Sequence, residues 1–190
     1  MTFGHEIAVR VPSTRELARV ERGLRGILPG GSTALRDALY AGTLLASGPG
    51  RPLLVLFTDG EDNLSWLDAH ELQRVLEESN VLVQTVGFVP PESPTHFPGR
   101  AQPPPGESPH VRTLRRLAEV TGGQFWPAAA PARLADAFSA IVEAMRLRYV
   151  LRFEPEHPRR EGRHELDVRL RHRRGKVHCR RAYFVSRSPR

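Results

Sequence analysis

Hydrophobic positions follow two different periods along this chain. From about residue 13 to residue 146, apolar side chains recur every three or four residues in several segments, which is the spacing of amphipathic helices. Short, nearly continuous apolar runs lie between these segments. From about residue 149 onwards, apolar and polar residues alternate, which is the spacing of half-buried strands. The pattern predicts an α/β body followed by a small β-structure.

Amphipathic helices are predicted from capping residues and apolar spacing. In the first helix, Ser13 and Glu16 fit a capping box, and Pro29 ends the segment. The second helix extends to about Ala46 and is predicted to bury Leu35, Ala38, Leu39 and Leu45. In chain order the predicted starts are Ser13, Ser32 or Thr33, Ser65 together with Asp68, Ser108 followed by Pro109, and Pro131.

Strands alternate with these helices. Residues 53–58 are almost all apolar, which is typical of a strand buried on both faces of a parallel sheet. Residues 81–89 predict another strand and residues 124–126 a short edge strand, while a brief strand over 7–11 precedes the first helix. This order with short connections indicates a parallel sheet. The predicted fold is therefore α/β, a partial doubly wound (Rossmann-like) sheet with flanking helices.

Two segments depart from this order. Eight of the twenty residues from 90 to 109 are proline, so this stretch is predicted to be an exposed insert without a core. Beyond residue 146, the period of two predicts three antiparallel strands, near 149–154, 165–170 and 177–185. We therefore divide the chain into a domain over 1–146, which contains the insert, and a C-terminal antiparallel β appendage over 147–190.

Charge is distributed unevenly along the 190 residues. The net charge is +7, but residues 146–190 hold 15 Lys and Arg against 5 Asp and Glu, whereas residues 1–145 hold 13 against 16. The basic end indicates either a solvated, arginine-rich surface or a site for an anionic partner such as nucleic acid or phospholipid. A single cysteine, Cys179, excludes an internal disulfide. No apolar run approaches the ~20 residues of a membrane-spanning helix.

Two segments carry candidate chemistry. Gly30-Gly31-Ser32-Thr33 precedes a predicted helix, and Thr58-Asp59-Gly60 directly follows a predicted strand. In a parallel α/β sheet, ligands bind at the carboxyl ends of the strands, and both segments fall on that edge. The Asp59 carboxylate and the Thr33 hydroxyl are oxygen ligands of the kind that Mg²⁺ or Mn²⁺ prefers.

These segments together resemble the von Willebrand factor type A (VWA) domain. Residues 30–39 are similar to the stretch that carries the family's metal-site threonine, and residues 53–63 to the strand and loop with its metal-site aspartate. The resemblance implies that Thr33 and Asp59 belong to a metal-ion-dependent adhesion site. Residues 3–11 resemble the hairpin that precedes the family's third helix. The C-terminal segment, with residues 149–155, 165–170 and 180–184, resembles the extension of the bacterial VWFA-related group.

One family motif is absent from the sequence. No segment matches Asp-x-Ser-x-Ser, which the family carries on its first, central strand. Thr33 and Asp59 alone leave most of the six positions around Mg²⁺ to water, so a metal is expected only if other ligands are supplied. We expect either a chain that lacks its N-terminal part or a degenerate domain. The corresponding expectations for localisation are export, to the periplasm or beyond, for a truncated member and the cytoplasm if Met1 is the start.

The predicted function is binding of a protein, not catalysis. By resemblance, the partner offers an acidic side chain to the metal, with Mg²⁺ or Mn²⁺ as the cation. One alternative is phosphate or nucleotide binding at the Gly30 to Thr33 helix start, although this segment lacks the lysine of a P-loop. Another is binding of an anionic polymer by the arginine-rich end, which would make affinity strongly dependent on salt. Neither nucleic acid nor membrane has strong support.

Overall fold

The computed structural model describes residues 1–28, 30–47, 50, 52–88, 108–128, 130–154, 161–172 and 174–185. The predicted proline-rich insert lies outside these residues except for its last two. In chain order the elements are β1 (Thr2–Phe3), β2 (Ile7–Ala8), α1 (Leu17–Leu24), α2 (Leu35–Ala46), β3 (Leu53–Thr58), α3 (Ala69–Glu78), β4 (Leu82–Phe88), α4 (Pro109–Val120), β5 (Phe125–Ala128), the 3₁₀ turn η1 (Pro131–Arg133), α5 (Leu134–Arg146), β6 (Gly162–Glu165) and β7 (Ala182–Val185).

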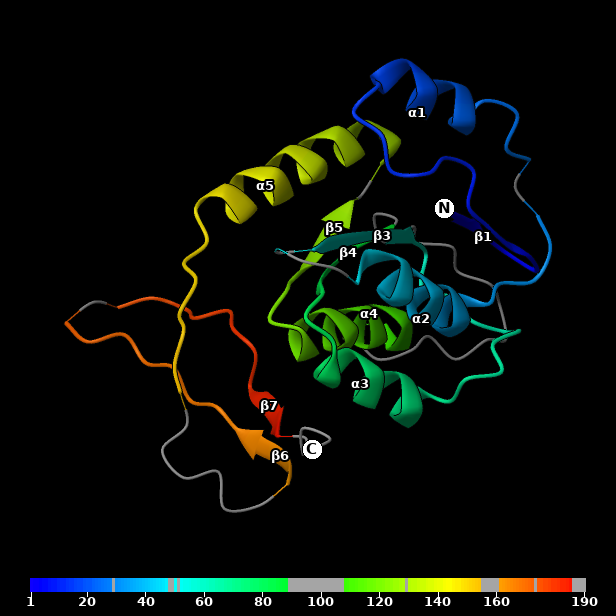
Figure 1. Ribbon diagram of the computed structural model, residues 1–190. Coiled ribbons are helices and arrows are strands. Elements are labelled where there is room, and N and C mark those ends of the chain that lie inside the picture. The colour runs from blue at the N-terminus through cyan, green and yellow to red at the C-terminus, as the bar shows by residue number, and fades with distance from the viewer. Residues whose placement is uncertain are drawn as a thin grey trace, which may run out of the picture.

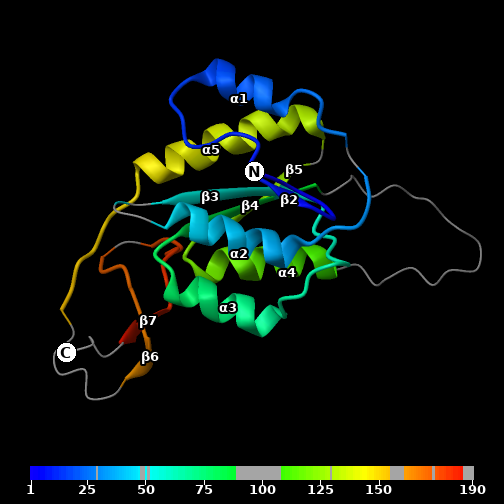
Figure 2. The same ribbon diagram turned by 45° about the vertical axis from the view of Figure 1, so that its right-hand side comes forward.

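A parallel sheet with the strand order β3–β4–β5 forms the centre of the body. Leu53 lies opposite Leu82, and Thr85 lies opposite Phe125. Helices α2, α3 and α4 cover one face of this sheet, and α5 covers the other, with α1 beyond α5 (Figures 1 and 2). The predicted α/β, Rossmann-like fold with flanking helices is confirmed.

The core is divided between the two faces of the sheet. The larger apolar cluster includes Leu39, Leu72 and Leu114 from α2, α3 and α4, packed against β3 and β4. The smaller cluster joins Ile141 of α5 to Val86 of β4. Burial of apolar area on both faces fixes the strands between the helices, and it thereby fixes where the loops at the strand ends lie.

Strand β3 matches its predicted bounds but not its predicted burial. Leu56 is buried, whereas Phe57 is 43% exposed. Among the described residues β3 pairs with β4 alone, so it lies at an edge of the sheet. Side chains at the outer margin of an edge strand remain accessible to water. The prediction that 53–58 is buried on both faces is therefore wrong.

The first helix differs from its prediction. Glu16 is the N-cap residue of α1 and makes no side-chain cap bond, so the capping box of Ser13 and Glu16 does not form. Instead, the Glu16 backbone N donates to the Thr14 hydroxyl oxygen at 3.1 Å, which holds the chain in a turn before the helix begins. No residue of α1 is buried, and Leu17 is 70% exposed. The strand predicted over 7–11 is shortened to β2, because its partner β1 is itself only two residues long.

Helix α2 buries one side chain that was not predicted and exposes one that was. Leu35 and Leu39 are buried as expected, but Leu45 is 62% exposed. Thr43 is buried because its hydroxyl donates to the Leu39 backbone O at 2.8 Å and so needs no water.

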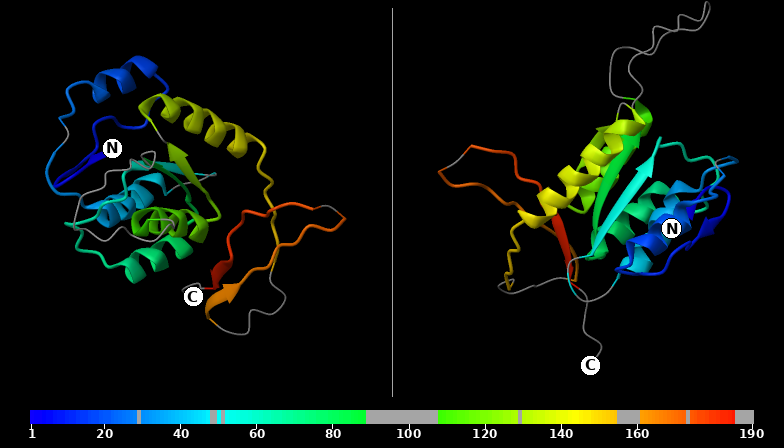
Figure 3. Two further views of the ribbon diagram at one scale, coloured as in Figure 1. Left: turned by 180° about the vertical axis from the view of Figure 1, so that it is seen from behind. Right: turned by 90° about the horizontal axis from the view of Figure 1, so that it is seen from above.

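The C-terminal appendage contains two strands in its described residues rather than three. Strands β6 and β7 pair antiparallel, beside the body of the molecule (Figure 3). Residues 149–154 form no strand, and Tyr149 and Leu151 are 89% and 70% exposed. An alternating pattern forms a strand only where a neighbour accepts its backbone hydrogen bonds. The small antiparallel β-structure is confirmed, but β7 is shorter than the predicted strand over 177–185, and β6 shares only Glu165 with the strand predicted over 165–170.

Candidate functional site

The candidate site lies at the carboxyl end of β3, where the loop 59–68 leads to α3. The start of α2 is bonded directly to this loop. The Thr33 backbone N donates to Asn63 Oδ1 at 2.7 Å, and the Asn63 backbone N donates to Thr33 O at 3.0 Å. The two segments that the sequence singled out therefore lie together at one end of the sheet.

The first turn of α2 is capped by this loop and not by its own hydroxyl residues. The N-cap residue Ala34 offers no side-chain acceptor. The Arg36 backbone N instead donates to Asp62 Oδ2 at 3.2 Å and to Ser65 Oγ at 3.0 Å. These acceptors occupy backbone N–H groups that a phosphate would need, and the carboxylate of Asp62 would repel an anion.

Ser65 therefore does not cap α3 as predicted. Asp68 alone does so, because its Oδ1 accepts from the backbone N of His70 at 2.7 Å and of Glu71 at 2.8 Å. The prediction that Asp68 caps α3 is confirmed, and Glu71, which was not predicted to take part, completes a capping box with it.

Asp37 of α2 binds the C-terminal end of the loop. Its two carboxylate oxygens accept from the backbone N of Trp66 at 3.0 Å and of Leu67 at 2.9 Å. The sequence carries no signal for this role of Asp37, because an aspartate in the first turn of a helix normally needs no explanation beyond the helix dipole. The role of Asn63 was not predicted either, because its partner Thr33 is 30 residues away in the sequence.

Asp59 is exposed and forms a turn within the loop. Its Oδ1 accepts from the Glu61 backbone N at 3.1 Å, which is an Asx-turn. The next residue, Gly60, has φ +88 and lies close to the first turn of α4, where a Cβ would come 2.9 Å from His110 Cβ. The Gly60 carbonyl is also 3.1 Å from His110 Nδ1. Only glycine suits this combination of conformation and close approach.

The described residues do not form a complete set of metal ligands. No group of three or more His, Cys, Asp or Glu side chains in the described part of the chain is arranged to hold a metal ion. Asp59 Oδ1 already accepts a backbone hydrogen bond, and the Thr33 backbone N donates to the Asn63 side chain. Two oxygens fall short of the six that Mg²⁺ requires.

Asp62 is the most constrained carboxylate of the loop. Its side chain is 14% exposed and lies 2.8 Å from Arg36 Nε. Partial burial acts to raise the pKa of Asp62, but hydrogen bonds from Ser65 and the charge and backbone N–H of Arg36 outweigh it, so the pKa is lowered. A lowered pKa means that the ionised carboxylate stabilises the folded protein.

We expect Asp62→Asn to lower the free energy of unfolding at pH 7 by about 1–2 kcal/mol, because the charged hydrogen bonds to Arg36 and Ser65 are weakened. The contribution of Asp62 is present above its unfolded pKa of 3.8 and is lost as pH falls through the lower folded value. Urea titrations between pH 7 and pH 2 should thus show the two proteins converging in acid. The exposed ion pair of Asp136 with Arg133 provides the control, and Asp136→Asn should change stability by less than about 0.5 kcal/mol. A constant difference at all pH values would contradict the assignment.

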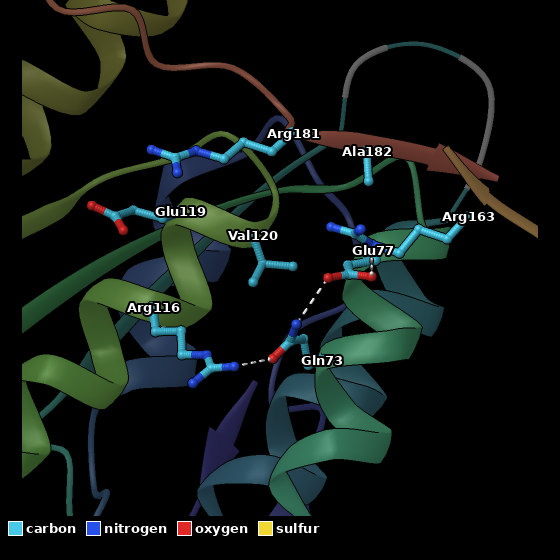
Figure 4. A pocket seen from close by; sticks show the side chains of 8 residues that line it. All are labelled: Gln73, Glu77, Arg116, Glu119, Val120, Arg163, Arg181 and Ala182. Atoms are coloured by element: carbon cyan, nitrogen blue, oxygen red, sulfur yellow. Dashed lines mark hydrogen bonds and ion pairs between the residues drawn. The ribbon is translucent and has the colours of Figure 1, made fainter. Parts of the chain in front are cut away.

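A surface cavity of about 260 Å³ lies away from this loop, between α3, α4 and the β6–β7 pair (Figure 4). Four of its six polar side chains bond to one another. Arg116 donates to Gln73 Oε1 at 2.8 Å, Gln73 donates to Glu77 Oε1 at 2.9 Å, and Arg163 lies 3.1 Å from Glu77 Oε2. These bonds connect the appendage to the body through β6, α3 and α4. The polar side chains of the cavity that form them serve to hold the two parts together.

Comparison with known proteins supports the fold. Neither a protein-family model nor a curated protein sequence matches the chain. The crystal structure of the conserved hypothetical protein BatB from Bacteroides thetaiotaomicron is similar with a TM-score of 0.51 and 18% identity, over 72% of this chain and 73% of that one. An uncharacterized membrane spanning protein from Vibrio fischeri aligns with a TM-score of 0.39 and 22% identity, over 75% of this chain and 72% of that one. At these identities the first likeness shows the fold alone.

The sequence also predicted that the chain has no membrane-spanning helix, and the lengths of the helices bear on this prediction. Within the described residues, none combines the length and the apolar character that a bilayer crossing requires.

Proposed function

We propose that this chain is a protein-binding module of the von Willebrand factor type A class, not an enzyme, and that its binding surface is the loop 59–68 at the carboxyl end of the sheet. The α/β fold and its similarity to BatB are compatible with this class. The bonded pair of Thr33 and Asn63 supports it further, because it unites the two sequence segments that resemble the family's metal site.

The hydrogen bonding of this loop to α2 is the observation that carries the proposal. Asn63, Asp62, Ser65 and Asp37 anchor it to α2 along most of its length, yet Leu64 and Trp66 remain 40% and 94% exposed. A fixed backbone that presents apolar side chains loses little conformational entropy when a partner binds. Loops of this kind, held by a rigid scaffold, commonly carry binding function.

A photoreactive benzophenone side chain at position 64, introduced into the full chain in its own cells, tests this proposal. We expect a covalent adduct with a protein at position 64 and none at position 149, where Tyr149 is also exposed but lies in the C-terminal part. Adducts of equal yield at both positions, or none at position 64, would overturn the proposal. Mass spectrometry of the adduct identifies the partner.

Metal dependence is a separate part of the proposal, and here we expect weak binding. Because Thr33 and Asp59 leave most positions around a cation to water, the chain should bind Mn²⁺ or Mg²⁺ no more tightly than in the millimolar range unless further ligands are supplied. Titration calorimetry with Mn²⁺ on the full chain, Thr33→Ala and Asp59→Ala should give the same small heats. A micromolar site that both substitutions abolish would contradict this expectation and would indicate a complete adhesion site.

The two alternative functions have less support. Phosphate binding at the start of α2 competes with acceptors already in place, namely Asn63 on the Thr33 backbone N and Asp62 on that of Arg36. Binding of an anionic polymer relies on the basic C-terminal part, where Arg163 and Arg169 already pair with carboxylates. A steep fall in affinity for duplex DNA between low and moderate salt would revive the second alternative.

A further inference from the structure

Trp66 is exposed to an unusual degree for its residue type. The residue is 94% exposed, although tryptophan is highly buried on average. The other tryptophan of the chain, Trp126, is partly buried, and its Nε1 donates to Gln84 Oε1 at 2.8 Å. The backbone at Trp66 is nevertheless fixed, since Asp37 accepts from the N–H groups of both Trp66 and Leu67. The indole is therefore displayed by an ordered loop.

Exposed apolar residues also lie on α2, whose first turn binds the Trp66 backbone through Asp37. Asp37, which binds the Trp66 backbone, shares one face of α2 with Tyr40 and Leu44, three and seven residues further on. Tyr40 and Leu44 are 39% and 56% exposed, and Leu64 in the loop is 40% exposed. Seven residues of helix span about 10 Å, which is enough to accept several side chains of a partner segment. We refer to Trp66, Leu64, Tyr40 and Leu44 as the Trp66 surface.

The loop around Trp66 is acidic, although the chain as a whole is basic. Between residues 59 and 71 the sequence has five acidic residues and neither Lys nor Arg, against a net charge of +7 for the chain. Arg36 neutralises Asp62 at 2.8 Å. The other four, which are Asp59, Glu61, Asp68 and Glu71, are all exposed. Such a loop attracts a cationic group and repels a carboxylate, so the partner inferred here is basic and not the acidic one that the family resemblance implies for a metal-loaded site.

We propose that the Trp66 surface docks onto a basic segment of a partner protein whose arginine side chains stack on the Trp66 indole. The proposal rests on the protein-binding function above and deepens it by naming the chemistry of the partner. Arginine is favoured over lysine because its planar guanidinium stacks on an aromatic face while it bonds to nearby carboxylates. The apolar residues Leu64, Tyr40 and Leu44 then receive the aliphatic residues of the same segment. A second copy of this chain, with its arginine-rich end, is one source of such a segment.

Two synthetic peptides test the proposal on the full-length chain. Both are acetylated, amidated octapeptides, one alternating leucine with arginine and the other leucine with glutamate. We expect the arginine peptide to bind at least about ten-fold more tightly than the glutamate peptide at low salt, and the advantage to shrink as salt is added. Trp66→Ala should weaken binding of the arginine peptide at least about ten-fold, since a stacked tryptophan is a typical hot spot. Trp66→Phe should restore part of that loss.

The control is Tyr149→Ala, which removes another exposed aromatic side chain and should leave affinity unchanged. Because Trp66 is exposed, its substitution should not unfold the chain, and circular dichroism verifies this. Equal affinity of the wild type and Trp66→Ala would overturn the proposal, as would preference for the glutamate peptide or no binding of the arginine peptide at millimolar concentration. Self-association that Trp66→Ala abolishes would support it and identify a second copy as the partner. If the adduct at position 64 forms while the arginine peptide fails, the protein-binding function survives and this inference alone is lost.

Discussion

Replacing Gly123 by alanine is expected to unfold the protein or to lower its free energy of unfolding by more than about 4 kcal/mol, which is exceptional for one substitution. A Cβ at this position would overlap the backbone carbonyl oxygen of Val83 and lie 2.9 Å from its carbonyl carbon. Val83 is fully buried in β4, the middle strand of the parallel sheet, so its backbone has no room to move away. Urea denaturation followed by circular dichroism measures the effect.

Gly4→Ala serves as the control for this substitution. A Cβ on Gly4 would meet the carbonyl oxygens of Ser32 and Gly30 at 3.6 and 3.7 Å, which is ordinary van der Waals contact. We expect a change of less than about 1 kcal/mol for Gly4→Ala. If both variants were equally stable, the turn between α4 and β5 would not approach β4 as closely as the structure shows.

The order of helices and strands in this fold could be predicted, because the start and end of each element depend on residues close to it in the sequence. The bounds of β3 follow from a run of apolar residues, and the start of α4 follows from Ser108 and Pro109. The Ser108 hydroxyl accepts from the Val111 backbone N at 3.2 Å, as an N-cap residue should. Gly122, which stands just past the C-cap residue of α4, has φ +79, a conformation that other residues adopt rarely. In each case the physical cause lies within a few residues of its effect.

Burial was harder to predict, because it depends on which neighbours are present. The apolar spacing of α1 is correct for an amphipathic helix, yet no residue of α1 is buried. Phe57 and Leu45 were both predicted to be buried and are both exposed. A periodic pattern shows which side of an element is apolar, but it does not show whether another element covers that side.

The candidate site was predictable only in outline. The rule that ligands bind at the carboxyl ends of parallel strands brought Thr33 and Asp59 to one edge of the sheet. The residues that build this edge, Asn63 and Asp37, act on backbone groups about 30 residues away in the sequence. Capping motifs in the sequence are local, so Ser32 and Thr33 seemed the natural caps for α2. In the structure, side chains of the loop 59–68 cap α2 instead of these two residues.

Arg180 provides a second long-range cap, and Arg180→Ala is expected to lower the free energy of unfolding by about 3 kcal/mol. Its guanidinium donates to the backbone O of Leu76 and of Glu77, both at 3.3 Å, and to that of Val81 at 2.7 Å. A cation at the C-terminus of α3 also interacts favourably with the helix dipole. Burial, and to a smaller degree the charge of Arg148, lower the pKa of Arg180, which reflects a guanidinium held away from water. Without it, these carbonyl groups would lose their charged donor.

The loss should also release the appendage, since Arg180 stands just before β7. Hydrogen exchange should accelerate at β6 and β7 in Arg180→Ala well before it does so at β4. Arg180→Lys keeps the charge but not the fork of donors that reaches three carbonyl groups, so it should recover only part of the stability. The neighbouring Arg181 is exposed, and Arg181→Ala should cost less than about 0.5 kcal/mol. Uniform acceleration of exchange across the whole chain would mean instead that the appendage and the body unfold as one cooperative unit, with Arg180 stabilising both.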